Sequence, residues 1–231
     1  RMYEGFLREI PPCASTHTYP KIWDLPASPS IAELKIPLEL AVIGTPITRV
    51  PDIVKECADA GISGAIIISA GGKEIGEKGQ KLEAAIGKAA GQSGLRIIGP
   101  NCVGIISSRS RLNASFANQM PLDGKMAFIS QSGAICTAIL DLSIKENIGF
   151  SYFVSLGDMV DVDFGDMIDY LGGEPEVSSI VMYVESLTHF RKFMSAARAV
   201  SRVKPIIALK AGRTQAGAIA AASHTGALAG E

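Results

Sequence analysis

The sequence has little of what marks several large classes of protein. Its 22 lysines and arginines are offset by 23 acidic residues, the formal net charge is -1, and no basic run is present. A nucleic-acid-binding protein needs a basic surface to neutralise phosphates, which this composition does not supply. Apolar runs such as 64–69 and 179–184 are far shorter than the roughly 20 residues of a membrane-spanning helix. We therefore expect neither a nucleic-acid partner nor a membrane.

Cysteine is also scarce. The four cysteines, at positions 13, 57, 102 and 136, form no CxxC pair and show no metal-ligand spacing. This pattern predicts reduced thiols in a cytoplasmic protein, without a disulfide framework. Hydrophobic residues, by contrast, are abundant. They make up 47% of the 231 residues, against 19% that are charged, and this fraction is enough to form a substantial core.

Short apolar runs alternate with helical patterns along most of the chain. The expected strands span 39–44, 64–69, 96–99, 125–130, 151–156, 179–185 and 205–212. Helical patterns lie between these runs, for example after Pro51, where Ile53, Val54 and Cys57 share one face. Alternating strands and helices predict an α/β protein whose parallel strands are joined by helical crossovers.

The pattern suggests two domains, one at 1–122 and one at 123–231. A polar, turn-rich segment at 107–124 has no clean period and is expected to be a linker or a long excursion between two α/β units. Residues 1–38 hold too many prolines and turns for a complete βαβ opening, and they lack the glycine-rich turn that begins a nucleotide-handling α/β domain. The N-terminal part of the first domain is therefore expected to be incomplete.

Small residues and hydroxyl groups follow the expected strands. The segments of interest are Gly44, Thr45 and Pro46; Ser69, Ala70 and Gly71; Asn101 and Cys102; and Ser130, Gln131, Ser132 and Gly133. Parallel strands present their carboxyl ends at one edge of a sheet, where open α/β proteins bind ligands. Small residues there allow the backbone to approach a bulky, phosphorylated ligand.

The motif SQSG at 130–133 joins a strand directly to a helix. The free N–H groups and the positive end of that helix predict an anion-binding site. An ordinary N-cap supplied by Ser132 fits the same residues equally well, and the motif alone leaves both interpretations open.

Several polar residues are ambiguous when taken singly. Glu185 ends an apolar strand and is either a functional carboxylate or a cap for the next helix. His224 lies among small residues in AAASHTGALAG and fits a surface histidine as well as a functional one. The five aspartates between 158 and 169 are expected to be solvated carboxylates around a helix start, not metal ligands. Cys102 has no histidine near it in sequence and fits small packing better than a nucleophile.

Taken together, four segments resemble the NDP-forming acyl-CoA synthetases, the superfamily of succinyl-CoA synthetase and ADP-forming acetate–CoA ligase. They are IIGPNCVGI, MAFISQSGA, IVMYVES and KAGRTQAGAIAAASHTGALAG, and the resemblance extends over roughly residues 36–230. It implies a Rossmann-like CoA-binding domain followed by a flavodoxin-like parallel α/β domain.

The resemblance also implies roles for the motif residues. His224 matches the histidine that is phosphorylated during turnover, Glu185 matches the carboxylate that orients it, and residues 130–133 match the helix N-terminus that holds the phosphate. The segments 44–46 and 69–71 match those that line coenzyme A, and Asn101 with Cys102 falls near its thiol end. No metal site is implied on this chain.

The activity implied is the synthesis of an acyl-CoA from a carboxylic acid, CoA and ATP through a phosphohistidine and an acyl phosphate. The sequence contains no ATP-grasp domain, so ATP or ADP with Mg is expected on a β-type partner subunit or further domain, in an oligomer. A small carboxylic acid is the expected substrate.

There are two alternatives to this function. A non-catalytic or regulatory acyl-CoA-sensing module of the same fold, as fused to some protein acetyltransferases, is the alternative, but the presence of both Glu185 and His224 favours an enzyme. A nicotinamide-dependent oxidoreductase is disfavoured because no G-x-G-x-x-G motif follows the first expected strand.

Overall fold

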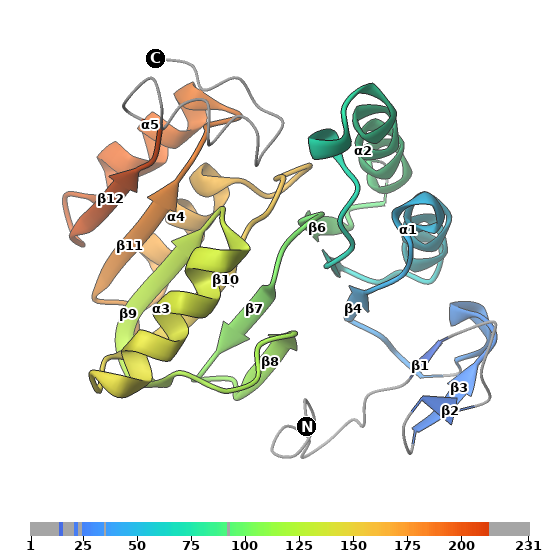
Figure 1. Cartoon of the computed structure of the whole chain (residues 1–231), viewed down its shortest axis with the longest axis horizontal. Helices are drawn as coiled ribbons and strands as arrows, with labels where there is room; N and C mark the ends of the chain where they lie inside the picture. The colour runs from blue at the N-terminus through green and yellow to red at the C-terminus, as the bar shows by residue number, and fades with distance from the viewer. Residues whose placement is uncertain (1–13, 16–20, 23–24, 35, 92, 213–231) are drawn as a thin grey trace.

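The computed structural model describes residues 14–15, 21–22, 25–34, 36–91 and 93–212 (Figure 1). One parallel sheet contains β4 (Leu40–Ile43), β5 (Gly64–Ile67) and β6 (Arg96–Ile98), in that order. Helices α1 (Val50–Asp59) and α2 (Glu77–Ala90) connect these strands. Short 3-10 helices span Ile31–Glu33, Ile47–Arg49 and Lys73–Ile75. The order of parallel strands and crossovers confirms the α/β prediction for this part of the chain.

A second sheet has the strand order β12-β11-β9-β10-β7-β8. Its parallel strands are β9 (Leu122–Ser130), β10 (Gly149–Ser155), β11 (Ser179–Val184) and β12 (Ile206–Lys210). The crossovers are α3 (Gly133–Lys145), α4 (Phe164–Gly173) and α5 (Phe190–Val200). All seven strands that the apolar runs predicted are therefore present.

The segment 107–124, expected to be a linker or a long excursion, contains a strand of this second sheet. Strands β7 (Gly104–Ser107) and β8 (Leu112–Ser115) form an antiparallel hairpin, and β7 pairs with β10. Ile106 and Ala114 are buried within it. Gly104 has a φ of 118°, and a Cβ there would lie 2.2 Å from the Ala114 carbonyl oxygen. The hairpin thus depends on close backbone packing, which a search for long apolar runs does not detect.

Residues 14–28 contribute a small sheet of three short strands, β1 (Ala14–Ser15), β2 (Lys21–Ile22) and β3 (Leu25–Ser28). Strand β3 is central, parallel to β1 and antiparallel to β2. The described residues before β4 are thus not arranged as a βαβ unit. The division of the chain into domains at residue 122 stays a prediction.

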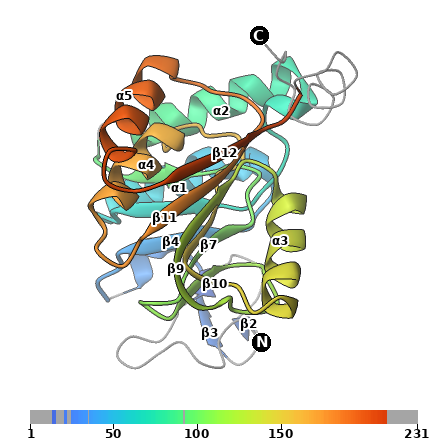
Figure 2. The same cartoon turned by 90° about the vertical axis from the view of Figure 1, so that its left-hand side faces the viewer.

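The second sheet is covered on both faces, as Figure 2 shows, with α3 on one side and α4 and α5 on the other. On the α3 side, Phe128, Phe150 and Phe153 pack against Cys136 and Leu140. The ring centroids of Phe128 and Phe153 are 4.9 Å apart. Burial on both faces explains why these strands read as continuous apolar runs in the sequence.

The two parallel sheets share part of their core. Alternate residues of β5 face opposite sides: Ala65 and Ile67 pack with α1 and α2, whereas Ile66 joins the core beneath α4. Ile98 of β6 joins the same core as Ile66, next to Met167 and Ile168. This packing holds the carboxyl ends of both sheets beside one another.

Two expectations from composition can be compared with the described residues. Within them, no helix combines the length and apolar character that crossing a membrane requires. Cys57, Cys102 and Cys136 are buried free thiols, as expected, and Cys13 lies outside the described residues.

Candidate functional site

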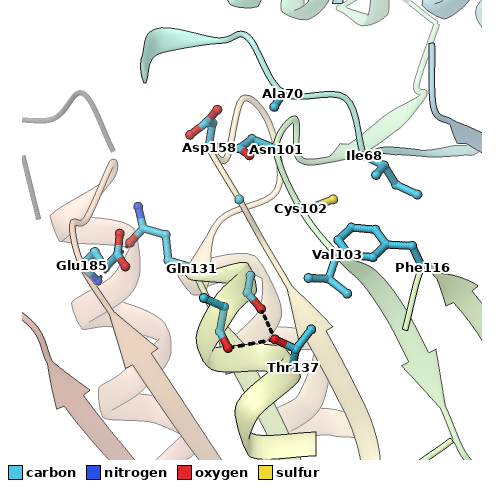
Figure 3. A pocket seen from close by; sticks show the side chains of 13 residues that line it. Ile68, Ala70, Asn101, Cys102, Val103, Phe116, Gln131, Thr137, Asp158 and Glu185 are labelled. Atoms are coloured by element: carbon cyan, nitrogen blue, oxygen red, sulfur yellow. Dashed lines mark hydrogen bonds between the residues drawn. The ribbon is translucent and has the colours of Figure 1, made fainter. Parts of the chain in front are cut away.

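A cavity of about 450 Å³ lies where the strands of both sheets end (Figure 3). Its walls come from the segments that follow β5, β6, β9, β10 and β11. Six of the residues singled out from the sequence line it: Ala70, Asn101, Cys102, Gln131, Gly133 and Glu185. Residues up to 115 positions apart in the chain thus meet at the edge that the parallel topology predicted.

Other predicted residues support this cavity without lining it. The Ser69 hydroxyl donates to the Thr45 carbonyl oxygen at 2.5 Å, and the Ser69 carbonyl accepts from the Asn101 N–H at 2.9 Å. The loops after β4, β5 and β6 are thereby tied to one another. The remaining predicted residues outside the lining are Gly44, Pro46, Gly71, Ser130 and Ser132. His224 lies outside the described residues.

The start of α3 shows how the SQSG motif is used. Ser132 is the N-cap, and its hydroxyl accepts from the Ile135 N–H at 3.4 Å. The Ser130 hydroxyl donates to the Ser132 carbonyl oxygen at 2.9 Å. Both serine side chains therefore shape the turn, and it is Gly133 and Ala134 at the first turn of the helix that line the cavity. N-capping is confirmed, while anion binding by this helix end stays a prediction.

Gln131 holds the segment that carries Glu185. Its carbonyl oxygen Oε1 accepts from the backbone N–H of Glu185 at 3.1 Å and of Ser186 at 2.9 Å. Its Nε2 donates to the Ser186 hydroxyl at 2.9 Å. Lys210 adds a bond from Nζ to the Glu185 carbonyl oxygen at 3.0 Å. The Gln131 amide is thus engaged with the end of β11, which makes it a positioning residue for Glu185.

Replacing Gln131 with alanine should lower the free energy of unfolding by about 1–3 kcal/mol, because it removes the acceptor of the buried Glu185 N–H and of the partly buried Ser186 N–H. Urea denaturation measures this loss. Gln119→Ala is the matched control, since Gln119 is exposed and bonds only Asp141 among the described residues. Its change should stay within about 0.5 kcal/mol. Equal losses in the two variants would contradict the role of Gln131 as a clamp.

The expectation for the five aspartates is wrong for Asp158. Asp163 and Asp166 do lie at a helix start and form a capping box for α4, although Asp163 is buried and not solvated as expected. Asp161 pairs with Arg96 at 3.0 Å. Asp158 is instead 5% exposed and lines the cavity. Burial raises the pKa of its carboxyl group to about 8; nearby Lys73 lowers it, while Glu83 and Glu74 raise it further. The sequence does not single out Asp158, because it is one of five aspartates between residues 158 and 169.

Cys102 lies in the cavity wall as a packing residue. Its Sγ donates to the Ile67 carbonyl oxygen at 3.2 Å, and the residue is 3% exposed. Burial raises the pKa of its thiol to about 12, so a thiolate is disfavoured near neutral pH. This agrees with the expectation that Cys102 is not a nucleophile. Its proximity to a cofactor thiol stays a prediction.

The cavity also contains residues that no sequence motif indicated. Phe116, which follows the β7–β8 hairpin, is half exposed and forms an apolar wall with Ile68 and Val103. Thr137 of α3 donates to the Ala134 carbonyl oxygen at 3.0 Å, one of the bonds drawn in Figure 3. Phe116 was missed because its segment was expected to be a linker.

Comparison with known families divides the chain into two matches. Residues 9–108 match the model of the CoA binding domain, and residues 123–231 match that of the succinyl-CoA ligase like flavodoxin domain. The cavity lining comes from both matched regions, with Phe116 between them.

The chain is similar to curated ADP-forming acetate–CoA ligases. It is 45% identical over 201 residues to the subunit alpha of acetate–CoA ligase II from Pyrococcus furiosus, covering 87% of this chain and 44% of that one. It is 42% identical over 212 residues to acetate–CoA ligase I from Archaeoglobus fulgidus, covering 92% of this chain and 31% of that one. The chain thus spans less than half the length of these relatives.

A solved structure has the same fold. The dinucleotide-forming acetyl-coenzyme A synthetase 1 of Ca. Korarchaeum cryptofilum, in complex with phosphate and ADP, matches with a TM-score of 0.88 and 38% identity. The match covers 95% of this chain and 47% of that one.

Proposed function

The chain belongs to the superfamily of NDP-forming acyl-CoA synthetases, and from this we propose that it is the CoA-ligase portion of an ADP-forming acid–CoA ligase. The observation that supports this most directly is the shared cavity. Ala70 and Asn101 of the predicted CoA segments, Gly133 at the start of α3 and Glu185 just after β11 all line one space. A cofactor thiol, a phosphoryl group and a catalytic carboxylate could therefore meet there.

His224 is the proposed nucleophile, and Glu185 its partner. A neutral imidazole is a competent nucleophile near pH 7, and a carboxylate hydrogen-bonded to its other nitrogen fixes the tautomer and stabilises the developing positive charge. The first N–H groups of α3, at Gly133 and Ala134, would hold the phosphoryl oxygens of the phosphohistidine. Glu185, Gly133 and Ala134 line the same cavity, which supports this assignment.

The proposed reaction has three balanced steps. The acid carboxylate attacks the phosphorus of phosphohistidine, which breaks the N–P bond and gives an acyl phosphate and neutral His224. The CoA thiolate then attacks the acyl carbon and expels inorganic phosphate, giving the thioester. ATP finally transfers its γ-phosphoryl group to His224 and leaves as ADP. In this scheme His224 serves two sites, one where it gives up its phosphoryl group and one where ATP restores it.

The nucleotide step needs a partner. We assign ATP with Mg to an ATP-grasp β-type subunit or domain, in an oligomeric enzyme. The proposed substrate is a small carboxylic acid, as the names of the acetate–CoA ligases among the relatives suggest. A cytoplasmic location fits the free thiols of Cys57, Cys102 and Cys136.

The test is reconstitution. The chain is combined with the ATP-grasp subunit or domain of its own enzyme, and acyl-CoA formation from ATP, CoA and acetate, propionate or larger acids is followed together with ADP release. Acyl-CoA and ADP in equal amounts support the proposal. Acyl-CoA binding without any phosphoryl transfer would instead favour a sensing module.

A further inference from the structure

Two glutamates, Glu74 and Glu83, lie beside the predicted CoA loop. Each has one carboxylate oxygen that accepts a hydrogen bond from a backbone N–H. Glu74, in the 3-10 helix after β5, accepts from the Gly71 N–H at 2.6 Å through Oε1. Glu83 of α2 accepts from the Lys73 N–H at 2.6 Å, also through Oε1. The second oxygen of Glu74 is buried and accepts no hydrogen bond from the described residues. The backbone thus fixes these carboxylates in place and leaves an acceptor unused.

Asp158 reaches the same point from a different part of the chain, the loop between β10 and α4. Its side chain is 4% exposed, and its Oδ2 accepts no hydrogen bond from the described residues. One oxygen from each of Asp158, Glu74 and Glu83 lies within 4.8 Å of the others. A Cβ at Gly72 would lie 2.2 Å from Glu83 Oε1 and 2.9 Å from Asp158 Oδ2, so a glycine keeps the space between these oxygens open.

The local charges do not balance. Lys73 donates from Nζ to the Asp158 carbonyl oxygen at 2.8 Å and lies 3.9 Å from Oδ1, so it supplies one positive charge against three carboxylates. Two negative charges in excess in a largely buried cluster are costly unless a cation or a proton compensates them. Burial is the main cause of the raised pKa of Asp158, and the charges of Glu83 and Glu74 and a hydrogen bond between the Asp158 and Glu74 carboxyl groups raise it further.

We propose that Glu74, Glu83 and Asp158 bind one Mg²⁺ ion, each through a carboxylate oxygen. Three oxygen ligands of fixed orientation suit a hard divalent cation, which retains water in its other positions. Asp158 also lines the cavity, which supplies a path for that water. A bound cation would tie the turn at Gly71 and Gly72 to the β10–α4 loop. This site is separate from the nucleotide-bound Mg expected on the partner, and it does not depend on the proposed function.

The test uses the purified chain after treatment with a chelator. Isothermal titration with MgCl₂, and broadening of water or protein signals by Mn²⁺, measure binding, and thermal denaturation measures stabilisation. We expect one site in the wild type and at least a tenfold loss of affinity in Asp158→Asn and in Glu74→Gln. Glu77→Gln is the control, because Glu77 is exposed and pairs with Lys81 on the outer face of α2.

Two results would overturn the proposal. One is the absence of any Mg²⁺-dependent heat, broadening or melting shift in the wild type, which would leave a proton as the compensating charge. The other is unchanged affinity in both Asp158→Asn and Glu74→Gln. Circular dichroism checks folding of each variant, and if Asp158→Asn does not fold, Glu74→Gln and Glu83→Gln provide the same comparison.

Discussion

Replacing His224 with alanine is expected to lower incorporation of label from γ-labelled ATP by at least about 10³-fold in the presence of the ATP-grasp partner, because the variant lacks the nucleophile that accepts the phosphoryl group. Phosphohistidine is acid-labile, unlike phosphoserine or phosphothreonine. The measurement is therefore label retained on the chain before and after mild acid treatment, together with acyl-CoA production. Both signals should disappear in the variant.

The other two histidines provide the controls. His189 is the N-cap residue of α5, its Nδ1 lies 2.8 Å from Asp163 Oδ2, and it does not line the cavity. His189→Ala and His17→Ala should keep acid-labile labelling within a few-fold of the wild type. Label that persists in His224→Ala and disappears in His189→Ala would show that His189, and not His224, is the phosphorylated residue. Label that persists in all three variants would end the phosphohistidine mechanism for this chain.

The sequence predicted the arrangement of the cavity well because parallel α/β topology fixes which chain segments meet. Ala70, Asn101, Gln131 and Glu185 belong to four different strand ends, and placing each expected strand in order was enough to bring them together. No side-chain detail was required for this step. The same argument could not decide what each residue does there, since SQSG fits an N-cap and an anion site alike.

Two features could not be predicted because they depend on contacts distant in sequence. Asp158 is buried and its carbonyl oxygen accepts a hydrogen bond from Lys73, 85 positions earlier, a contact that the local run of aspartates does not indicate. The β7–β8 hairpin has strands of only four residues, and its place in the sheet depends on pairing with β10, over 40 residues downstream. The role of Gln131 could not be predicted for the same reason, because its amide oxygen accepts hydrogen bonds from the backbone N–H groups of Glu185 and Ser186.

These bonds fix the main chain of Glu185 independently of its own carboxylate, which makes the proposed role of that carboxylate testable by itself. Gln131 and Lys210 hold the main chain of Glu185, through its N–H and its carbonyl oxygen respectively. A substitution that alters only the Glu185 side chain should therefore leave the end of β11 in place. The charge of the carboxylate can be removed without moving the backbone that carries it.

Glu185→Gln should consequently slow phosphorylation of His224 by roughly 10²-fold or more, because glutamine keeps the size of the side chain but cannot stabilise a positive imidazole. Rapid-quench labelling with ATP and the partner gives this rate, and urea denaturation of the same variant should show a change within about 1 kcal/mol, as for a near-isosteric replacement. Glu176→Gln is the matched control, since Glu176 is half exposed and pairs with Arg109 at 3.4 Å.

If Glu185→Gln labels at the wild-type rate while His224→Ala does not label at all, His224 remains the nucleophile and a group other than Glu185 must orient it. If the rate falls only in proportion to a loss of stability, the carboxylate is structural, and the clamp by Gln131 serves the fold and not the reaction.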